Sequence, residues 1–175
     1  MIIGIDGGLG SGKTALMTGY LYEDFKQGFD VKANYSLNFK HDTLDVLSLL
    51  EKNPNLKDVS IGIDEITVFM DCRTSASKMN RLISYFILQS RKRNVTLYYT
   101  TQDFNMVDLR LINHTHIQIV CNCIYDEDGN PIDDIRKYTI FDFRNPHDIK
   151  SNMFYLDISN VYGLYNTDEI IVPPI

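Results

Sequence analysis

The feature of this sequence that most restricts its fold is the segment GGLGSGKT at residues 7–14, in which four glycines lie within six residues and a lysine and a threonine follow. The run fits the spacing G-x-x-x-x-G-K-[S/T], and it lies between a predicted strand over residues 1–6 and a predicted helix over residues 14–28. Glycines permit positive φ angles and place no side chains between a polyphosphate and the backbone N–H groups, and the start of the helix adds its positive dipole end. The run therefore predicts a loop that binds the phosphates of a magnesium–nucleotide complex.

Each position of the predicted loop has a physical role. Lys13 is expected to place a positive charge between the β- and γ-phosphates, where it would also assist catalysis, and the Thr14 hydroxyl is expected to bind Mg2+. The other contacts to ATP are expected mainly from the loop backbone. The complete set of expected nucleotide-binding residues is Gly7, Gly8, Leu9, Gly10, Ser11, Gly12, Lys13, Thr14 and Ala15.

A second oxygen ligand for magnesium is predicted at the end of the apolar strand VSIGIDE, residues 59–65. Asp64 ends this strand, so its carboxylate is expected at the carboxyl edge of the sheet, beside the phosphate loop. Glu65 follows directly and is suited to orient and deprotonate a water that attacks the γ-phosphate. The pair favours nucleotide hydrolysis over binding alone; the plainer alternative is that both acids simply end a strand.

The strand VTLYYTTQ, residues 95–102, also ends in polar side chains. If this strand lies between the first and third strands of the chain, Gln102 points at the γ-phosphate and can sense its presence. We therefore include Gln102 among the predicted catalytic residues, with a polar strand end as the alternative.

The order of the elements predicts an α/β fold. Strands alternate with helices, the latter also expected over residues 42–53 and 77–91, and the early strands are apolar on both faces, which is typical of a parallel sheet covered on both sides. Later, HIQIVCNCIY and RKYTIFDF flank a polar turn, the pattern of a hairpin added to the sheet edge. We expect one domain over residues 1–175, with a core over 1–123 and a C-terminal β-hairpin and tail over 124–175.

Charge and composition limit the classes of function. A net charge of −6 argues against a surface that is basic throughout, as in a protein that coats nucleic acid. Residues 72–102 nevertheless contain no Asp or Glu and carry the cations Arg73, Lys78, Arg81, Arg91, Lys92 and Arg93. No apolar run is long enough for a membrane span and no basic leader is present, which predicts an intracellular protein without stable membrane insertion. The three cysteines include no C-x-x-C pair, so a disulfide framework or zinc site is not expected.

These motifs resemble the FtsK/HerA superfamily of DNA-pumping ATPases. The resemblance rests on GGLGSGKT, on IGIDE and above all on LQSRKRNVTLYYTTQDFNMVDLRLINHTHIQIV, where Arg91, the Thr101–Gln102 pair and the RLIN segment match the family in order and spacing. It spans residues 1 to about 123. The segments GFDVKANYSLNF and YGLYNTDEI further resemble viral packaging and morphogenesis ATPases, including relatives of zonula occludens toxin-like phage assembly proteins.

The resemblance implies a three-layer RecA-like P-loop NTPase core of the additional-strand, catalytic-glutamate type, with a mainly parallel central sheet and a C-terminal antiparallel β-hairpin extension. It also implies ring assembly, usually as a hexamer, in which an arginine from one subunit completes the site of its neighbour. That role falls on Arg91, with Arg93 as the near substitute. The implied partners are double-stranded DNA, further copies of the chain and a capsid or portal-like viral protein, in the host cytoplasm or in transient association with the virion. Residues 70–78 and 104–110 are the two segments considered for contact with DNA.

The leading hypothesis is thus an ATP-hydrolysing motor that translocates double-stranded DNA and packages a viral genome into a capsid. The second is a virion assembly or export ATPase of the zonula occludens toxin-like type, which would act on protein and membrane partners. From another class, a small-molecule kinase would recruit residues 91–93 for a lid over its substrate. A nucleotide-dependent switch would need Lys13 and Thr14 but neither of the predicted catalytic side chains Glu65 and Gln102.

Overall fold

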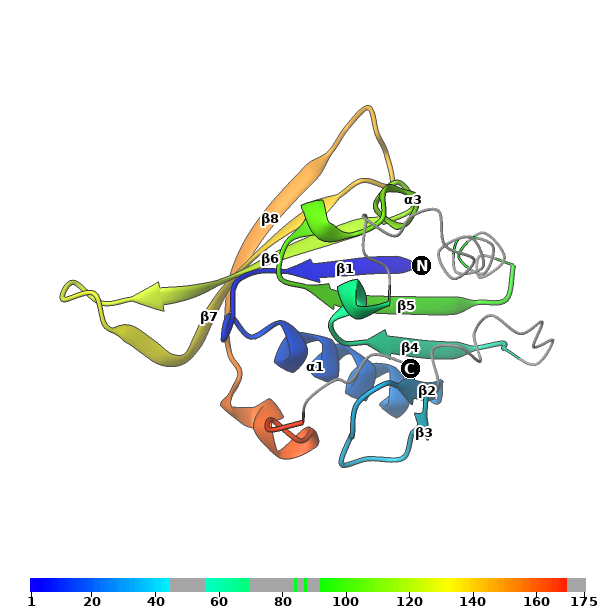
Figure 1. Ribbon diagram of the computed structural model, residues 1–175, viewed down its shortest axis with the longest axis horizontal. Helices are drawn as coiled ribbons and strands as arrows, with labels where there is room; N and C mark the ends of the chain where they lie inside the picture. The colour runs from blue at the N-terminus through cyan, green and yellow to red at the C-terminus, as the bar shows by residue number, and fades with distance from the viewer. Residues whose placement is uncertain (45–55, 70–83, 85–86, 88–91, 170–175) are drawn as a thin grey trace.

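An eight-stranded sheet forms the framework of the computed structural model, which describes residues 1–44, 56–69, 84, 87 and 92–169 (Figure 1). The strands are β1 (Ile2–Asp6), β2 (Asp30–Ala33), β3 (Asp42–Thr43), β4 (Val59–Ile63), β5 (Val95–Thr101), β6 (Ile117–Tyr125), β7 (Pro131–Asp142) and β8 (Lys150–Asp157). Their order across the sheet is β3-β2-β4-β5-β1-β6-β7-β8. All neighbours among the first six strands of this order pair in parallel, whereas β7 pairs antiparallel with β6, and β8 with β7. The predicted mainly parallel sheet with an antiparallel C-terminal extension is confirmed.

Strand β5 lies between β1 and β4, although it follows β4 in the chain. This is the inserted central strand that the sequence analysis predicted. As a result, the carboxyl ends of β1, β4 and β5 meet at one edge of the sheet, on the left in Figure 1. The predicted phosphate loop follows β1, the pair Asp64 and Glu65 follows β4, and Gln102 follows β5.

Both faces of the parallel sheet are buried, because alternate residues of each strand face opposite sides. On one side, Ile3 and Ile5 share a core with Met17 and Leu21 of helix α1 (Lys13–Lys26). On the other side, the core includes residues from β1, β4 and β5 together with Leu111 of the short helix α3 (Leu109–Ile112). The short 3-10 segments η2 (Ile66–Val68) and η4 (Phe104–Met106) follow β4 and β5. The predicted three layers are therefore present.

After β8 the chain returns to the first half of the molecule. The 3-10 segment η5 (Ser159–Leu164) packs on α1, and the residues around it then reach the loop after β2. There, the N–H of Asn38 donates to the carbonyl of Leu164 at 2.8 Å, and the N–H of Asn166 donates to the carbonyl of Ser36 at 3.2 Å. We call residues 158–169 the C-terminal strap.

Two predicted helices fall largely outside the described residues. Of the one expected over 42–53, Asp42 and Thr43 instead form strand β3, because their backbone pairs in parallel with Lys32 and Ala33 of β2. Of the one expected over 77–91, the described residues 84 and 87 are helical. Among the helices that the structure describes, none combines the length and the apolar composition needed to cross a membrane.

Candidate nucleotide-binding and catalytic site

The predicted phosphate loop connects β1 to α1, and two of its glycines lie where no other residue fits. Gly7 has a φ of 150°, and a Cβ at this position would lie 2.3 Å from the carbonyl oxygen of Cys121 in β6. Gly12, the N-cap of α1, has a φ of 88°, and a Cβ there would lie 2.8 Å from the hydroxyl of Tyr138 in β7. The loop backbone is therefore pressed against the C-terminal strands at both of its ends.

Two buried polar side chains of the loop suit a bound phosphate. Lys13 is buried, and its Nζ donates to the carbonyls of Gly7 and Gly8, at 2.9 Å in both cases. The hydroxyl of Ser11, a residue only 2% exposed, has no hydrogen-bond partner among the described residues. A buried hydroxyl without a partner costs free energy, and a phosphate oxygen in the loop would accept its hydrogen. The residues present thus fit a bound polyphosphate.

The two predicted magnesium ligands lie together. Thr14 Oγ1 donates to Oδ1 of Asp64 at 3.0 Å, and Thr100 Oγ1 donates to the same oxygen at 2.5 Å. Asn34 fixes the backbone at this point, since its Oδ1 accepts from the N–H of Asp64 at 2.7 Å and its Nδ2 donates to the carbonyl of Asp64 at 3.0 Å. Burial raises the pKa of Asp64, while the hydrogen bonds from Thr100 and Thr14 and the nearby Lys13 charge oppose that rise.

This pair fits Mg2+ bound together with a nucleotide. A hydroxyl and a carboxylate are oxygen ligands of the kind that Mg2+ accepts, and the ion usually completes its octahedron with waters and phosphate oxygens. Within the described part of the chain, no cluster of three or more His, Cys, Asp and Glu could hold a metal ion. A cation at Thr14 and Asp64 would therefore depend on the phosphates and on water for its other ligands.

The predicted catalytic side chains Glu65 and Gln102 meet next to this pair. Glu65 has a left-handed backbone, with φ 51° and ψ 60°, and its N–H donates to Thr100 Oγ1 at 2.9 Å. This conformation is uncommon outside glycine, and here it turns the chain directly after Asp64. Gln102 Nε2 lies 3.4 Å from Glu65 Oε1, which is a long hydrogen bond. Thr100 thus joins Asp64 to Glu65, and Gln102 meets Glu65 at the carboxyl edge.

Arg91, the predicted trans arginine, lies outside the described residues. A different arginine, Arg136 of β7, lies at the phosphate loop, and the sequence analysis did not single it out. Its Nε donates to the carbonyl of Gly10 at 3.1 Å, and its Nη1 donates to the carbonyls of Ile132 at 3.3 Å and Ile135 at 3.0 Å. Among the described residues it forms no ion pair with a carboxylate. Its positive charge therefore lies at the predicted phosphate loop.

A cavity of about 270 Å³ opens beside the loop and the first turn of α1. Residues 10–15 form one wall. Arg136 and three residues of the C-terminal strap, Ile158, Tyr162 and Tyr165, complete its lining. The nucleotide site predicted from the first strand and helix is thus completed by segments from the far end of the chain.

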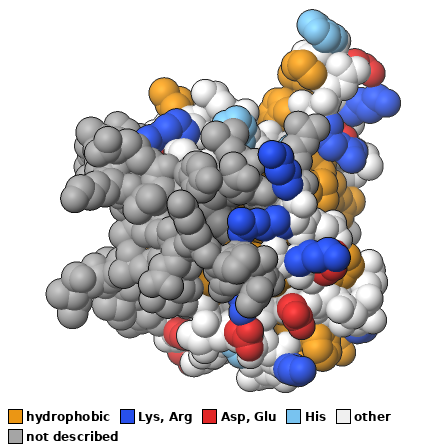
Figure 2. Space-filling view, turned by 90° about the vertical axis from the view of Figure 1, so that its right-hand side faces the viewer, with side chains coloured by type: hydrophobic (Ala, Val, Ile, Leu, Met, Phe, Trp, Pro, Cys, Tyr) orange, Lys and Arg blue, Asp and Glu red, His pale blue; other side chains and the backbone are white. Residues whose placement is uncertain are grey.

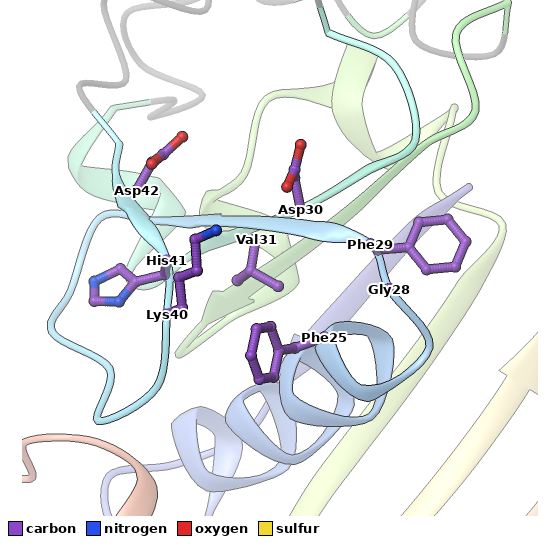
Figure 3. Close-up of a pocket in the computed structure, with 8 residues that line it drawn as sticks. All are labelled: Phe25, Gly28, Phe29, Asp30, Val31, Lys40, His41 and Asp42. Atoms are coloured by element: carbon purple, nitrogen blue, oxygen red, sulfur yellow. The ribbon is translucent and has the colours of Figure 1, made fainter.

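A second cavity, of about 190 Å³, lies at the other end of α1 (Figure 3). It is lined by Phe25, Gly28, Phe29, Asp30, Val31, Lys40, His41 and Asp42. The side chains of Phe25 and Val31 point toward each other, while the carboxylates of Asp30 and Asp42 project to the opposite side of the chain (Figure 3). The two carboxylates therefore lie apart from the side on which Phe25 and Val31 meet (Figure 3).

The surface expected to contact DNA is described only in part. Of the cations between residues 72 and 102, the structure describes Lys92 and Arg93, and the segment 70–78 lies outside the described residues. In the other candidate segment, 104–110, the positive charge of Arg110 is paired with Asp108 at 2.5 Å. Figure 2 shows Lys and Arg side chains together with Asp and Glu on the described part of the face that carries the amino ends of the parallel strands. Contact with DNA stays a prediction.

No protein-family model and no curated protein sequence matches this chain. Among solved structures, it is similar to the N-terminal domain of zonular occludens toxin from Neisseria meningitidis, with a TM-score of 0.69 and 20% identity over 94% of this chain and 98% of that one. It is also similar to the genome packaging NTPase B204 from Sulfolobus turreted icosahedral virus 2 in complex with ATP-gammaS, with a TM-score of 0.58 and 11% identity over 86% of this chain and 96% of that one. A third solved structure, itself an ATPase domain, is similar as well, with a TM-score of 0.59 and 13% identity over 95% of this chain and 84% of that one. The chain therefore has the RecA-like P-loop ATPase fold that these structures share.

Proposed function

We propose that this protein is an ATPase that translocates double-stranded DNA and packages a viral genome. The observation that carries the chemical part of the proposal is the position of Thr100 between the two acids. Its Oγ1 donates to the Asp64 carboxylate at 2.5 Å and accepts from the N–H of Glu65 at 2.9 Å. One acid can therefore bind the metal while its chain neighbour stands beside the γ-phosphate.

In the proposed reaction, the loop N–H groups and Lys13 bind the phosphates, and Thr14 and Asp64 hold Mg2+, which when bound withdraws charge from the phosphate oxygens. Glu65 accepts a proton from a water as the water oxygen forms its bond to the γ-phosphorus. The bond from that phosphorus to the bridging oxygen breaks, and its electron pair leaves with ADP. Gln102, through its contact with Glu65, senses whether the γ-phosphate is present.

Coupling to DNA is supported by two observations. The fold resembles that of a protein described as a genome packaging NTPase, and residues 72–102 are rich in cations. We propose that the chain works as a ring, most simply a hexamer, in which Arg91 of one subunit enters the site of the next. The ring would act in the host cytoplasm with a capsid or portal-like viral protein as its partner, and only phosphate contacts are needed for pumping.

A second candidate is a virion assembly or export ATPase. The likeness to the zonular occludens toxin domain favours it, because that likeness covers 94% of this chain and 98% of the other. A small-molecule kinase is less well supported, since an acid directly after Asp64 favours water as the phosphoryl acceptor. A switch with negligible turnover would make no use of Glu65.

Phosphate-release assays with and without double-stranded DNA test the proposal. The wild-type protein with Mg2+ is expected to hydrolyse ATP and to do so faster with DNA. Glu65→Gln keeps the shape of the side chain but cannot accept the proton, so it is expected to bind ATP and to lose roughly 10^2-fold or more of its turnover. Glu127→Gln, in the exposed turn between β6 and β7, is the matched control and should behave as wild type.

Any other result of these assays contradicts a specific part of the proposed function. Normal turnover in Glu65→Gln would remove Glu65 from the mechanism. A rate indifferent to DNA would favour the assembly ATPase, phosphoryl transfer to a small acceptor would favour the kinase, and binding without turnover in the wild type would favour the switch.

A further inference from the structure

The C-terminal strap closes the cavity at the phosphate loop, and hydrolysis as proposed above makes no use of it. Ile158, Tyr162 and Tyr165 line this cavity together with residues 10–15. The lining of the cavity therefore combines the backbone of the predicted phosphate loop with apolar and aromatic side chains. Arg136 also lines the cavity, with its Nε 3.1 Å from the carbonyl of Gly10.

Hydrogen bonds fix the strap on both sides of the cavity. At its start, the N–H of Ile158 donates to the carbonyl of Asp134 in β7 at 2.8 Å. Beyond the cavity, Tyr165 forms a bridge with Leu37, and its ring contacts that of Tyr35 edge-on at a centroid distance of 6.3 Å. This part of the lining is thus formed before any ligand arrives, which lowers the entropic cost of binding.

The exposure of the three strap residues suits a flat ligand. Ile158 is fully buried and shares a core with Ala15 and Leu16 of α1, so it fixes the start of the strap on this helix. Tyr165 is half-buried, and burial raises its pKa to about 12. Tyr162 is 37% exposed and therefore presents part of its ring to the cavity opening. Uncharged rings pack favourably on the faces of nucleobases.

We propose that Tyr162, supported by Ile158 and Tyr165, forms the base-binding wall of the nucleotide site. This inference rests on the proposed nucleotide binding at the phosphate loop and adds the part that holds the nucleoside. A nucleotide whose phosphates lie on residues 10–14 extends its base along the cavity toward the strap. The strap thereby distinguishes a nucleoside triphosphate from a bare polyphosphate, which the loop alone cannot do.

Calorimetric titration with two probes tests the wall: ATPγS and inorganic tripolyphosphate, each with Mg2+. The wild-type protein is expected to bind both. Tyr162→Ala should raise the Kd for ATPγS roughly threefold to tenfold and leave the Kd for tripolyphosphate unchanged, since the lost contact is a ring-to-base contact. Tyr162→Phe keeps the ring and should keep the affinity. Tyr155→Ala removes a tyrosine that is 58% exposed on β8 and should change neither Kd.

The comparison of probes separates the possible failures. An unchanged Kd for ATPγS in Tyr162→Ala overturns the wall, and so does an equal loss for both probes, which would mean that the strap only shapes the phosphate loop. Should Tyr162→Ala fail to fold, Tyr162→Leu removes the ring while keeping apolar volume, and the same outcomes apply. If the wild-type protein binds neither probe, both the proposed function and the base-binding wall are contradicted. If it binds tripolyphosphate but not ATPγS, phosphate binding by the loop is supported and only the base-binding wall is contradicted.

Discussion

At the scale of single residues, Arg136 is the side chain that adds most to the predicted site. Its guanidinium bonds to the loop carbonyl of Gly10 at 3.1 Å and lines the nucleotide cavity. We expect its charge to contact the ligand phosphates; a charge-assisted hydrogen bond of that kind contributes about 1.5–3 kcal/mol, so Arg136→Ala is expected to weaken ATPγS binding by about tenfold or more. Lys137→Ala makes the same change in net charge on the opposite face of β7 and should leave the affinity unchanged. An equal effect of both variants in calorimetry would assign the loss to net charge alone.

The same residue shows what the sequence could not predict. Lys13, Thr14 and Asp64 could be predicted because loop spacing and the end of a strand fix their positions locally. Arg136 reaches the loop only through two successive pairings: β6 beside β1, with Val120 opposite Asp6, and β7 beside β6, with Arg136 opposite Cys123. A slip of one residue in either pairing would turn its side chain to the other face, and no local pattern specifies that register.

At the scale of elements, α3 depends on one buried carboxylate. Asp108 is only 1% exposed and accepts from the N–H of Arg110 at 2.9 Å and from its Nε at 2.7 Å. The hydrogen bonds from the Arg110 side chain, together with its backbone N–H, lower the pKa of Asp108 below the usual range of a carboxyl. A carboxyl whose pKa is lower in the folded than in the unfolded state stabilises the fold above the unfolded pKa, and that contribution is lost as the pH falls through the folded pKa.

Asp108→Asn is therefore expected to lower the free energy of unfolding at pH 7 by about 1 kcal/mol, because it keeps a capping oxygen but loses the charge that Arg110 binds. Urea unfolding at a series of pH values checks this. The difference from wild type should be largest at neutral pH and shrink below about pH 4, where the wild-type carboxyl gains its proton. The effect of Arg110→Ala should shrink in the same way, and a difference that is constant with pH would contradict the assignment.

The elements also differ in how far their sequence determines them. β1, β4 and β5 are compact apolar runs, and β6 and β7 flank a polar turn, so each could be predicted from its own residues. β8 and the strap could not be predicted as observed. Nearly every residue of β8 is exposed, so its sequence carries little apolar alternation, and its place depends on pairing with β7. The strap likewise depends on partners in α1 and in residues 35–38.

At the scale of the whole molecule, the site lies at an open edge of the sheet. The hairpin of β6 and β7 projects beyond this edge, past the start of α1 (Figure 1). Asp64 and Glu65 are both half-buried, and Gln102 is exposed. A group from a neighbouring subunit can therefore approach the γ-phosphate side, and the proposal that Arg91 acts in trans can be tested by mixing subunits.

Arg91→Ala and Glu65→Gln are each expected to be nearly inactive alone, since a trans arginine contributes roughly 10^3 to 10^5 in rate. In an equimolar mixture, a site that has an Arg91→Ala subunit and a Glu65→Gln neighbour contains both an intact Glu65 and an intact Arg91. With random assembly about a quarter of the sites are of this kind, so phosphate release should recover to a measurable fraction of the wild-type rate. Mixing Glu65→Gln with Lys13→Ala is the control and should restore nothing, because both changes disable the subunit that carries them. A mixture of Arg91→Ala and Glu65→Gln that stays inactive would mean that Arg91 serves its own subunit, and full activity of Arg91→Ala alone would transfer the role to Arg93.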